Sequence, residues 1–266
     1  MQLQKAIERP GLLCSATLAE IKKERKQLTA ISLFTGCGGA ALGIRQAGFE
    51  IRVMVEWDKN VCKTLWANWT MEGLKNMHTG YQMANAERKK KGLKMILPHW
   101  YQKREPAILQ ADITKTSTAE ILAAGGLQVG EASLLEGGFP CQGFSTAGAR
   151  IINDPRNKLY KECVRVIREA LPRIFFLENV PGLVSMAKGR IIRQIVKDLA
   201  GCGYNISWDI LDACDYGVPQ HRKRVFINGL RKDVAIFRKN GRMELHMGAC
   251  PGTEHHPDWF LKKYPA

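Results

Sequence analysis

Short apolar segments alternate with longer amphipathic or polar segments along most of the chain, and this alternation restricts the fold more than any other feature. Strands are expected over residues 30–34, 51–56, 107–109, the residues leading to Gly137, and residues 174–177, 206–211 and 225–230. Helices are expected over residues 40–47, 60–69, 116–124, 159–171 and 191–200. Strands and helices that alternate through short links predict an α/β protein with a mostly parallel sheet covered on both faces.

The same pattern gives the expected domain organisation. Residues 1–28 read as a helical lead-in, and residues 29–231 form the alternating domain. Residues 70–103 interrupt the alternation with polar and basic side chains, so we expect a partly helical insertion there. Residues 232–266 form a short basic tail.

The charge of the chain indicates what it binds. There are 40 lysine and arginine residues against 25 aspartate and glutamate residues, a net charge of +15 over 266 residues. This balance suits a polyanion, with nucleic acid first and an acidic membrane surface second, although many basic side chains simply solvate a surface. No apolar run approaches the ~18 residues that a membrane span needs.

The cysteines indicate the compartment. The eight thiols form no C-x-x-C pair and no Cys/His group with zinc-finger spacing, so we expect neither a disulfide framework nor a bound metal. Residues 1–10 lack the apolar stretch of a secretory signal. We therefore expect reduced thiols and a cytoplasmic location.

One cysteine follows a strand directly. Its segment reads Gly137-Gly138-Phe139-Pro140-Cys141-Gln142, and two glycines and a proline at the end of an apolar strand lift the next side chain out of the core. Parallel α/β sheets bind their ligands outside the carboxyl ends of the strands, where a thiol can act as a nucleophile. The alternative is a small buried cysteine after a turn.

A glycine-rich turn and two acidic residues follow the first three strands. Residues 34–39 join the first strand to its helix, and Glu56 ends the second strand, where a carboxylate can accept hydrogen bonds from ribose hydroxyls. Trp57 can lie against an adenine ring or pack at the rim. Asp112 can accept from an exocyclic amine or simply form a turn.

Two further motifs carry charged groups. Glu178 ends a fully apolar strand, where a carboxyl group has a raised pKa and can donate a proton, unless it pairs with a structural arginine. Gln220-His221-Arg222-Lys223-Arg224 leads into the last strand. Strand alternation would place Gln220, Arg222 and Arg224 on one side of the strand. The two guanidinium groups there could bind a phosphate or a base edge, or they could form structural ion pairs.

In this order and spacing, the motifs resemble those of the cytosine-C5 DNA methyltransferases over roughly residues 29–231. The residues that carry the resemblance are Phe34-x-Gly36-x-Gly38-Gly39, Glu56, Asp112, Pro140-Cys141-Gln142, Glu178-Asn179-Val180 and Gln220-x-Arg222-x-Arg224. The resemblance implies a Rossmann-like, doubly wound methyltransferase fold with S-adenosylmethionine as methyl donor. It also implies double-stranded DNA as substrate, with the target cytosine flipped out of the helix, typically in a restriction-modification system.

The resemblance also assigns roles to residues. The catalytic residues would be Cys141, Glu178 and Arg222. Cofactor contacts would come from Phe34, Gly36, Gly38, Gly39, Glu56, Trp57, Asp112 and Pro140. Nucleic-acid contacts would come from Gln142, Ser145, Arg150, Asn179 and Arg224. Ser32 stands where many members carry an aspartate, which weakens a contact to the amino group of the donor.

One departure from the family pattern shapes the functional expectation. Members continue past the Gln-x-Arg-x-Arg strand with a target-recognition region and an asparagine-containing helix, and neither is evident here. We expect the catalytic half of a split enzyme whose second subunit recognises the target, or a truncated gene product. The alternatives are an RNA cytosine methyltransferase, whose Cys-Phe-Thr signature is absent, a non-catalytic nucleic-acid-binding remnant, and a nicotinamide oxidoreductase.

Overall fold

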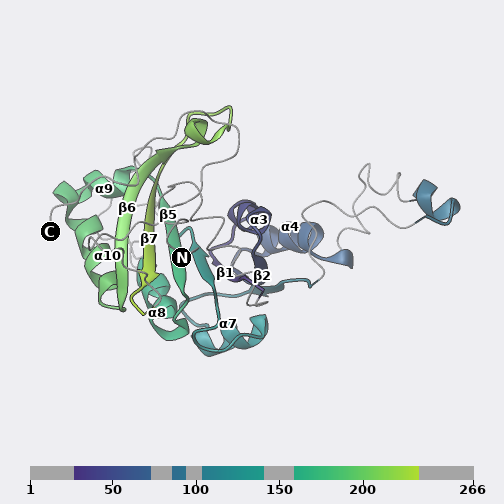
Figure 1. Cartoon of the computed structure of the whole chain (residues 1–266), viewed down its shortest axis with the longest axis horizontal. Coiled ribbons are helices and arrows are strands. Elements are labelled where there is room, and N and C mark those ends of the chain that lie inside the picture. Colours follow the sequence, from purple (N-terminus) through teal and green to yellow (C-terminus); the bar gives the residue numbers. More distant parts are fainter. Residues whose placement is uncertain (1–26, 73–85, 94–103, 141–158, 234–266) are drawn as a thin grey trace, which may run out of the picture.

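The computed structural model describes residues 27–72, 86–93, 104–140 and 159–233, and its centre is a seven-stranded sheet. The strands lie in the order β3-β2-β1-β4-β5-β7-β6 (Figure 1). Their bounds are β1 Thr29–Leu33, β2 Glu50–Glu56, β3 Ala107–Gln110, β4 Leu134–Gly137, β5 Ile174–Asn179, β6 Tyr204–Asp212 and β7 Lys223–Arg231. Each predicted strand is confirmed, with its ends shifted by at most two residues.

Strand direction sets where ligands can bind. The neighbours among β1 to β5 pair in parallel, and β7 runs antiparallel to both β5 and β6. Sequence order reverses between β1 and β4, which lie side by side although two strands separate them in the chain. In open α/β sheets, ligands bind in the crevice that such a reversal opens at the carboxyl ends of the strands.

Helices cover both faces of the sheet, as the alternation predicted. The longer ones are α3 Gly39–Gln46, α4 Lys59–Trp69, α7 Thr118–Gly125, α8 Tyr160–Ala170 and α10 Arg190–Ala200. Short helical segments are α9 Gly182–Ser185, η2 Met186–Gly189 and η3 Ala213–Tyr216. Figure 1 shows α3 and α4 beside β1 and β2, and α8, α9 and α10 beside β5, β7 and β6. The doubly wound arrangement is therefore confirmed.

Two apolar cores follow from the alternation of side chains along each strand. Ile31 and Leu33 of β1 point to the core shared with α7, α8 and α10, whereas Ala30 points to the core shared with α3 and α4. Local sequence fixes the helix starts: Asp58 caps α4 by accepting from the amides of Asn60 and Val61. Ser117 and Glu120 form a capping box at α7.

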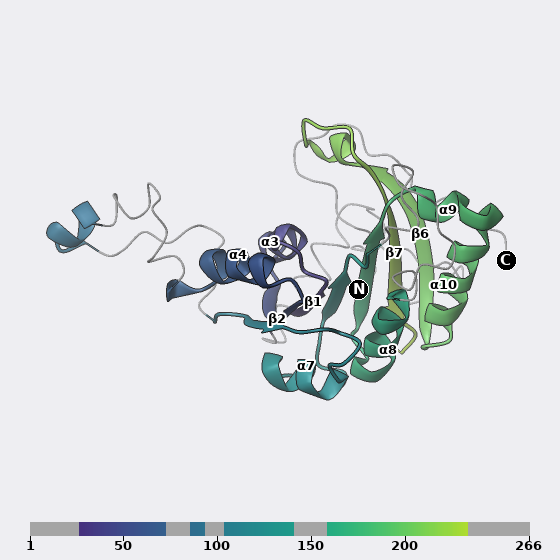
Figure 2. The same ribbon diagram turned by 180° about the vertical axis from the view of Figure 1, so that it is seen from behind.

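The last two strands form a long hairpin that rises beyond the helices in both ribbon views (Figures 1 and 2). Because β7 begins at Lys223, Gln220 and Arg222 lie before the strand. The predicted strand alternation from Gln220 to Arg224 is therefore wrong over its first half. The conformation of the turn before Lys223 is instead fixed by hydrogen bonds to Asp212, which are described below.

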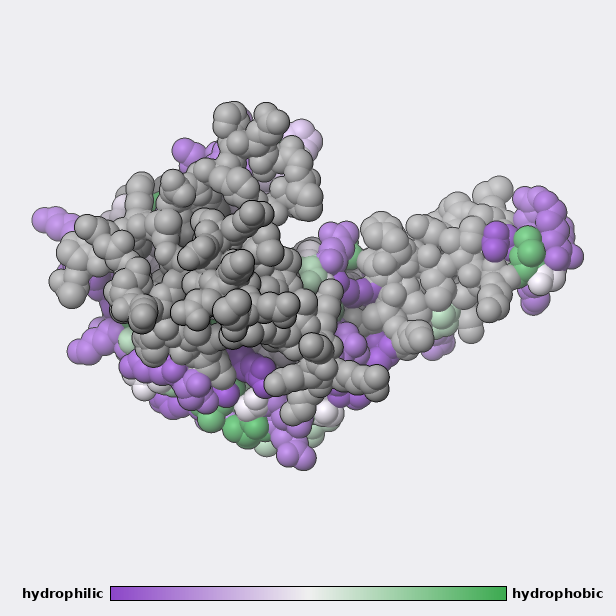
Figure 3. All heavy atoms as spheres, in the orientation of Figure 1, coloured by the Kyte–Doolittle hydropathy of each residue, from purple (hydrophilic) through white to green (hydrophobic). Residues whose placement is uncertain are grey.

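The outer surface of the described residues is largely polar. Hydrophilic side chains dominate the part visible in Figure 3, and small hydrophobic patches show at its lower edge, where α7 lies in Figure 1. The basic run begins in a short helical stretch with Arg88-Lys89-Lys90 and ends in the following turn at Lys91, and most of these residues are exposed. None of the helices among the described residues is long and apolar enough to cross a membrane.

Candidate active site

The turn after β1 is shaped by positive φ angles. Phe34 has φ 52°, Gly36 φ 57° and Gly38 φ 87°. A Cβ added at Gly38 would lie 2.6 Å from Nε1 of Trp69, so this glycine lets the turn pack on α4. A Cβ at Gly36 would meet nothing within 4 Å, which leaves open space for a ligand against the backbone. A strained non-glycine residue such as Phe34 is common at ligand sites.

Glu56 connects this turn to β2. Its Oε2 accepts a hydrogen bond from the amide of Gly36 at 2.9 Å. Its Oε1 accepts from the amides of Trp57 at 2.9 Å and Asp58 at 3.0 Å. A carboxylate has about four acceptor sites, so Oε2 keeps capacity for one more donor, such as a ribose hydroxyl. The carboxylate therefore holds two strand ends together and still has room for a ligand.

The two residues predicted to contact an adenine ring have different environments. Trp57 is 72% exposed at the end of β2, so its ring is free to cover a planar ligand. Asp112 forms a turn, because its Oδ1 accepts from the amide of Thr114 at 3.0 Å and from its hydroxyl at 2.7 Å. These bonds from Thr114 hold the pKa of Asp112 below its ordinary value. The turn-forming alternative thus describes Asp112 as this structure shows it.

The Glu-Asn-Val motif at the end of β5 lies against the turn that leads to Cys141. Nδ2 of Asn179 donates to the carbonyl of Phe139 at 3.1 Å. A Cβ added at Gly138 would lie 3.6 Å from Oε2 of Glu178, so the carboxylate borders the same turn. Pro140 follows within the described residues. The predicted site residues Cys141, Gln142, Ser145 and Arg150 lie outside them.

Asn179 does not fit the predicted nucleic-acid contact. Its side chain is 2% exposed, its Nδ2 serves Phe139, and its Oδ1 accepts from the amide of Val180 at 2.9 Å. Both ends of the amide are therefore used inside the protein. The residue positions the turn before Cys141, and a buried side chain of this kind offers nothing to a nucleic acid.

Glu178 is paired with an arginine. Nε of Arg224 lies 2.8 Å from its Oε1, and both side chains are partly buried. The alternative of a carboxylate paired with an arginine therefore describes Glu178 in this structure. The guanidinium beside Glu178 belongs to Arg224, whereas Arg222 lies on an exposed turn. The structure thus brings Arg224, rather than Arg222, to the predicted acid.

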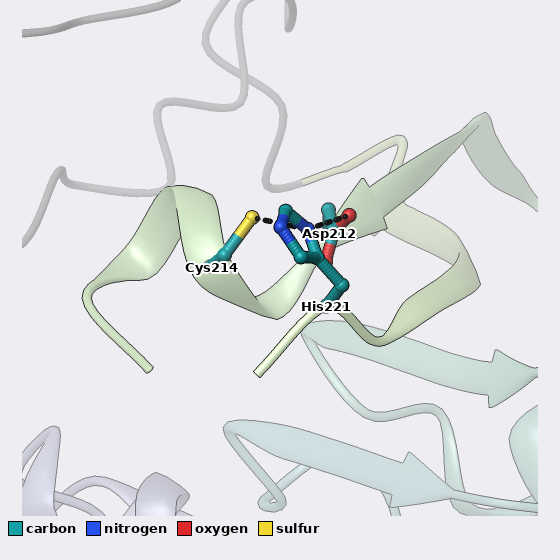
Figure 4. A group of neighbouring side chains, drawn as sticks. All are labelled: Asp212, Cys214 and His221. Atoms are coloured by element: carbon teal, nitrogen blue, oxygen red, sulfur yellow. Dashed lines mark hydrogen bonds and ion pairs between the residues drawn. The ribbon is translucent and has the colours of Figure 1, made fainter. Parts of the chain in front are cut away.

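A hydrogen-bonded group holds the turn that carries these arginines (Figure 4). Asp212, at the end of β6, accepts from the amide of Arg222 at 2.7 Å, and its Oδ2 lies 3.2 Å from Nδ1 of His221. That nitrogen also lies 3.2 Å from the sulfur of Cys214 in η3. The three side chains come within metal-ligand reach of one another, but their hydrogen bonds already explain the arrangement as a way of fixing the turn.

Sequence reasoning passed over one acidic residue at the site. Glu136 lies in β4, in register with Ser32 of β1, and is 4% exposed. Its Oε2 has no hydrogen-bond partner among the described residues. The pKa of Glu136 is raised to about 7, mainly by burial; hydrogen bonding from Ser32 opposes this rise and the charge of Glu178 adds to it. A charged residue at the end of an otherwise apolar run was the signal that could have found it.

These groups meet at one edge of the sheet, since Glu56, Gly36, Gly138 and Glu178 all stand at the carboxyl ends of parallel strands. A family model described as "C-5 cytosine-specific DNA methylase" matches residues 28–83 and 73–248. The chain belongs to this family. The glycine turn, the Pro-Cys turn and the Glu-Asn-Val strand end all fall within the part of the chain that matches the DNA methylase model.

Individual DNA methylases align with the same region. The type II methyltransferase M.BsuRI of Bacillus subtilis is 34% identical over 213 residues, which are 80% of this chain and 45% of that protein. M.AquIA of Picosynechococcus sp. is 37% identical over 210 residues, 76% of this chain and 71% of that protein. The chain thus spans about half the length of M.BsuRI and a larger share of M.AquIA.

The fold agrees with the sequence match. A crystal structure described as a DNA modification methyltransferase encoded within an E. coli prophage superposes with a TM-score of 0.58. It is 26% identical in sequence, and the superposition covers 82% of this chain and 51% of the other. The methyltransferase fold of the described residues is therefore shown by two independent comparisons.

Proposed function

We propose that this chain transfers a methyl group from S-adenosylmethionine to C5 of a cytosine that is flipped out of double-stranded DNA. The observation that carries the proposal is the packing of Glu178 and Asn179 against the turn that precedes Cys141, with Arg224 paired to Glu178. That turn lies next to the glycine turn after β1, because β4 and β1 pair directly. A methyl donor and a nucleophilic thiol would then share one edge of the sheet.

The residues present fit such a donor. Open space beside Gly36 and Gly39, the remaining acceptor capacity of Glu56 and the exposed ring of Trp57 suit an amino-acid end, a ribose and an adenine in turn. When bound, S-adenosylmethionine would supply an electrophilic methyl group. The protein would contribute the backbone of the turn and the Glu56 carboxylate as fixed contacts.

On the cytosine side, each residue has a task that its chemistry allows. Cytosine C5 is a poor nucleophile, and addition of the Cys141 thiolate to C6 makes C5 electron-rich. Glu178 would contact N3 of the base and hold a proton there. Arg224 would keep that carboxylate in place and face the base or its phosphate. Removal of the C5 proton then expels the thiol.

Trapping on DNA tests the catalytic assignment. A duplex oligonucleotide with 5-fluorocytosine should form a covalent adduct with the protein in the presence of S-adenosylmethionine, because fluorine at C5 blocks the final elimination. Cys141→Ser should form none. Cys202→Ser is the matched control, since Cys202 lies after α10 and away from the site, and it should form the adduct normally. An adduct that survives Cys141→Ser contradicts the proposal.

The same assay separates the alternatives. A 5-fluorocytosine RNA that traps the protein better than DNA would favour the RNA methyltransferase. No adduct with either, by a chain that still binds DNA, would favour the non-catalytic remnant. The dependence of the adduct on S-adenosylmethionine excludes a nicotinamide enzyme.

A second subunit for target recognition stays a prediction. The alignment covers 45% of M.BsuRI, so that relative contains a large part with no counterpart in the aligned region of this chain, whereas it covers 71% of M.AquIA. Bisulfite sequencing of DNA methylated by the chain alone tests it. Methylation confined to one sequence would show that this chain reads its own target.

A further inference from the structure

Glu136 is a buried acid that the proposed catalytic steps do not use. It is the third residue of β4 and stands in register with Ser32 of β1 and Phe176 of β5. Only 4% of it is exposed. A buried carboxylate is unfavourable unless hydrogen-bond donors or a cation compensate its charge.

The described residues supply only part of that compensation, through hydrogen bonding from Ser32. Oε2 of Glu136 has no hydrogen-bond partner among them. The groups that act on it from neighbouring strands are the Ser32 hydroxyl on β1 and the Glu178 carboxylate on β5. The Cys163 thiol of α8 lies in the core on the other face of the sheet, together with Leu135. The guanidinium of Arg224 is paired with the neighbouring Glu178. The free oxygen therefore calls for a donor from outside the described protein groups.

The position of Glu136 suggests which donor this is. Sequence order reverses between β1 and β4, and the glycine turn with its open space follows β1 at the same edge of the sheet. An amino-acid end bound against that turn carries an ammonium group with three N–H donors. The sulfonium of the donor has no N–H, and the adenine amine is neutral. The ammonium is thus the group that satisfies both the charge and the hydrogen bonding of Oε2.

We propose that Glu136 receives the α-ammonium group of the methyl donor and so selects the amino-acid end of the cofactor. The proposal rests on the proposed function and adds a positioning residue to it. Binding would satisfy Oε2 and leave the carboxylate ionised beside a cation. Because burial raises the pKa of Glu136 to about 7 in the free protein, binding near neutral pH would release a proton.

Calorimetry with two ligands tests this. S-adenosylhomocysteine carries the ammonium group, and 5′-methylthioadenosine lacks the whole amino-acid end. Glu136→Gln keeps the shape of the side chain and should weaken S-adenosylhomocysteine on the order of tenfold or more, the usual effect of losing a charge-assisted hydrogen bond. Binding of 5′-methylthioadenosine should not change. Glu50→Gln is the matched control, because Glu50 also has a buried carboxylate oxygen but stands at the first residue of β2, at the other end of the strand from the site. This variant should leave both affinities unchanged.

Proton release gives a second measurement that needs no variant. Near pH 7, titrations in buffers of different ionisation enthalpy should show release of up to one proton with S-adenosylhomocysteine and none with 5′-methylthioadenosine. Equal weakening of both ligands by Glu136→Gln, no weakening of either, or no proton release by the natural protein would overturn the inference. Failure of the natural protein to bind either ligand would overturn the proposed function as well.

Discussion

The guanidinium of Arg224 lies against the carboxylate of Glu178, with Nε 2.8 Å from Oε1, although the two residues stand on strands of opposite direction. Glu178 is near the end of β5, and Arg224 is near the start of β7. An antiparallel neighbour brings its first residues to the edge where the parallel strands end. The reversed direction of β7 is therefore what delivers an arginine to the site.

Arg224→Gln should lower methyl transfer by about a hundredfold, since loss of one preorganised charged donor at a reacting centre typically costs 10²–10³ in rate. S-adenosylhomocysteine binding should stay the same, because the arginine acts on the base side of the site. Single-turnover methylation and calorimetry measure the two effects. Lys223→Gln, on the adjacent exposed residue of the same strand, is the control. Equal losses in both variants would mean that only overall basic charge matters.

Asn179→Ala should lower the free energy of unfolding by about 1–3 kcal/mol, because it leaves the Phe139 carbonyl and the Val180 amide without their buried partner. Urea unfolding measures this. Asn205→Ala is the matched control, since Nδ2 of Asn205 is buried with no hydrogen-bond partner in the part of the chain that the structure describes, and its removal should cost less. Adduct formation by Asn179→Ala should fall further than its stability explains, because the turn before Cys141 loses its anchor.

The order of elements and the site edge could be predicted from sequence, because hydrophobic periodicity and turn residues are local signals. Residues 174–177 are all apolar, which predicts a buried strand, and the polar residues Glu178 and Asn179 that follow are therefore expected at its end. The partners across the site could not be predicted. That Arg224 pairs with Glu178 depends on the direction of β7, which no local pattern encodes.

Register explains the other misses. Ser32 was read as a lost contact to the donor, and only the pairing of β1 with β4 shows that the carboxyl group of Glu136 stands beside it. Asn179 was read as a nucleic-acid contact because it belongs to a motif. Its burial depends on the turn at Phe139, forty residues earlier in the chain.

Replacement by alanine should change the free energy of unfolding in opposite directions at Gly38 and at Gly43. Gly38→Ala places a Cβ 2.6 Å from Nε1 of Trp69 at φ 87°, so it should destabilise the free protein by more than the roughly 1–2 kcal/mol of a left-handed residue alone. Gly43→Ala, inside α3 with nothing within 4 Å, should stabilise it by up to about 1 kcal/mol. Thermal unfolding of the two variants measures the difference. A stabilised Gly38→Ala would contradict the packing of the turn on α4.

Glu136→Gln should change how stability depends on pH. Burial raises the pKa of Glu136 from 4.5 to about 7, so between these values the unfolded chain releases a proton that the folded protein keeps. The free energy of unfolding of the natural protein should therefore fall as pH rises from about 4.5 to 7, and level off above 7. The loss is about 3 kcal/mol, taking 1.36 kcal/mol for each unit of pKa. Glu136→Gln has no group to ionise there and should lack this fall, whereas Glu50→Gln should keep it. Urea unfolding from pH 5 to 8 measures all three proteins, and parallel curves for the natural protein and Glu136→Gln would show that Glu136 is not the buried acid that the structure describes.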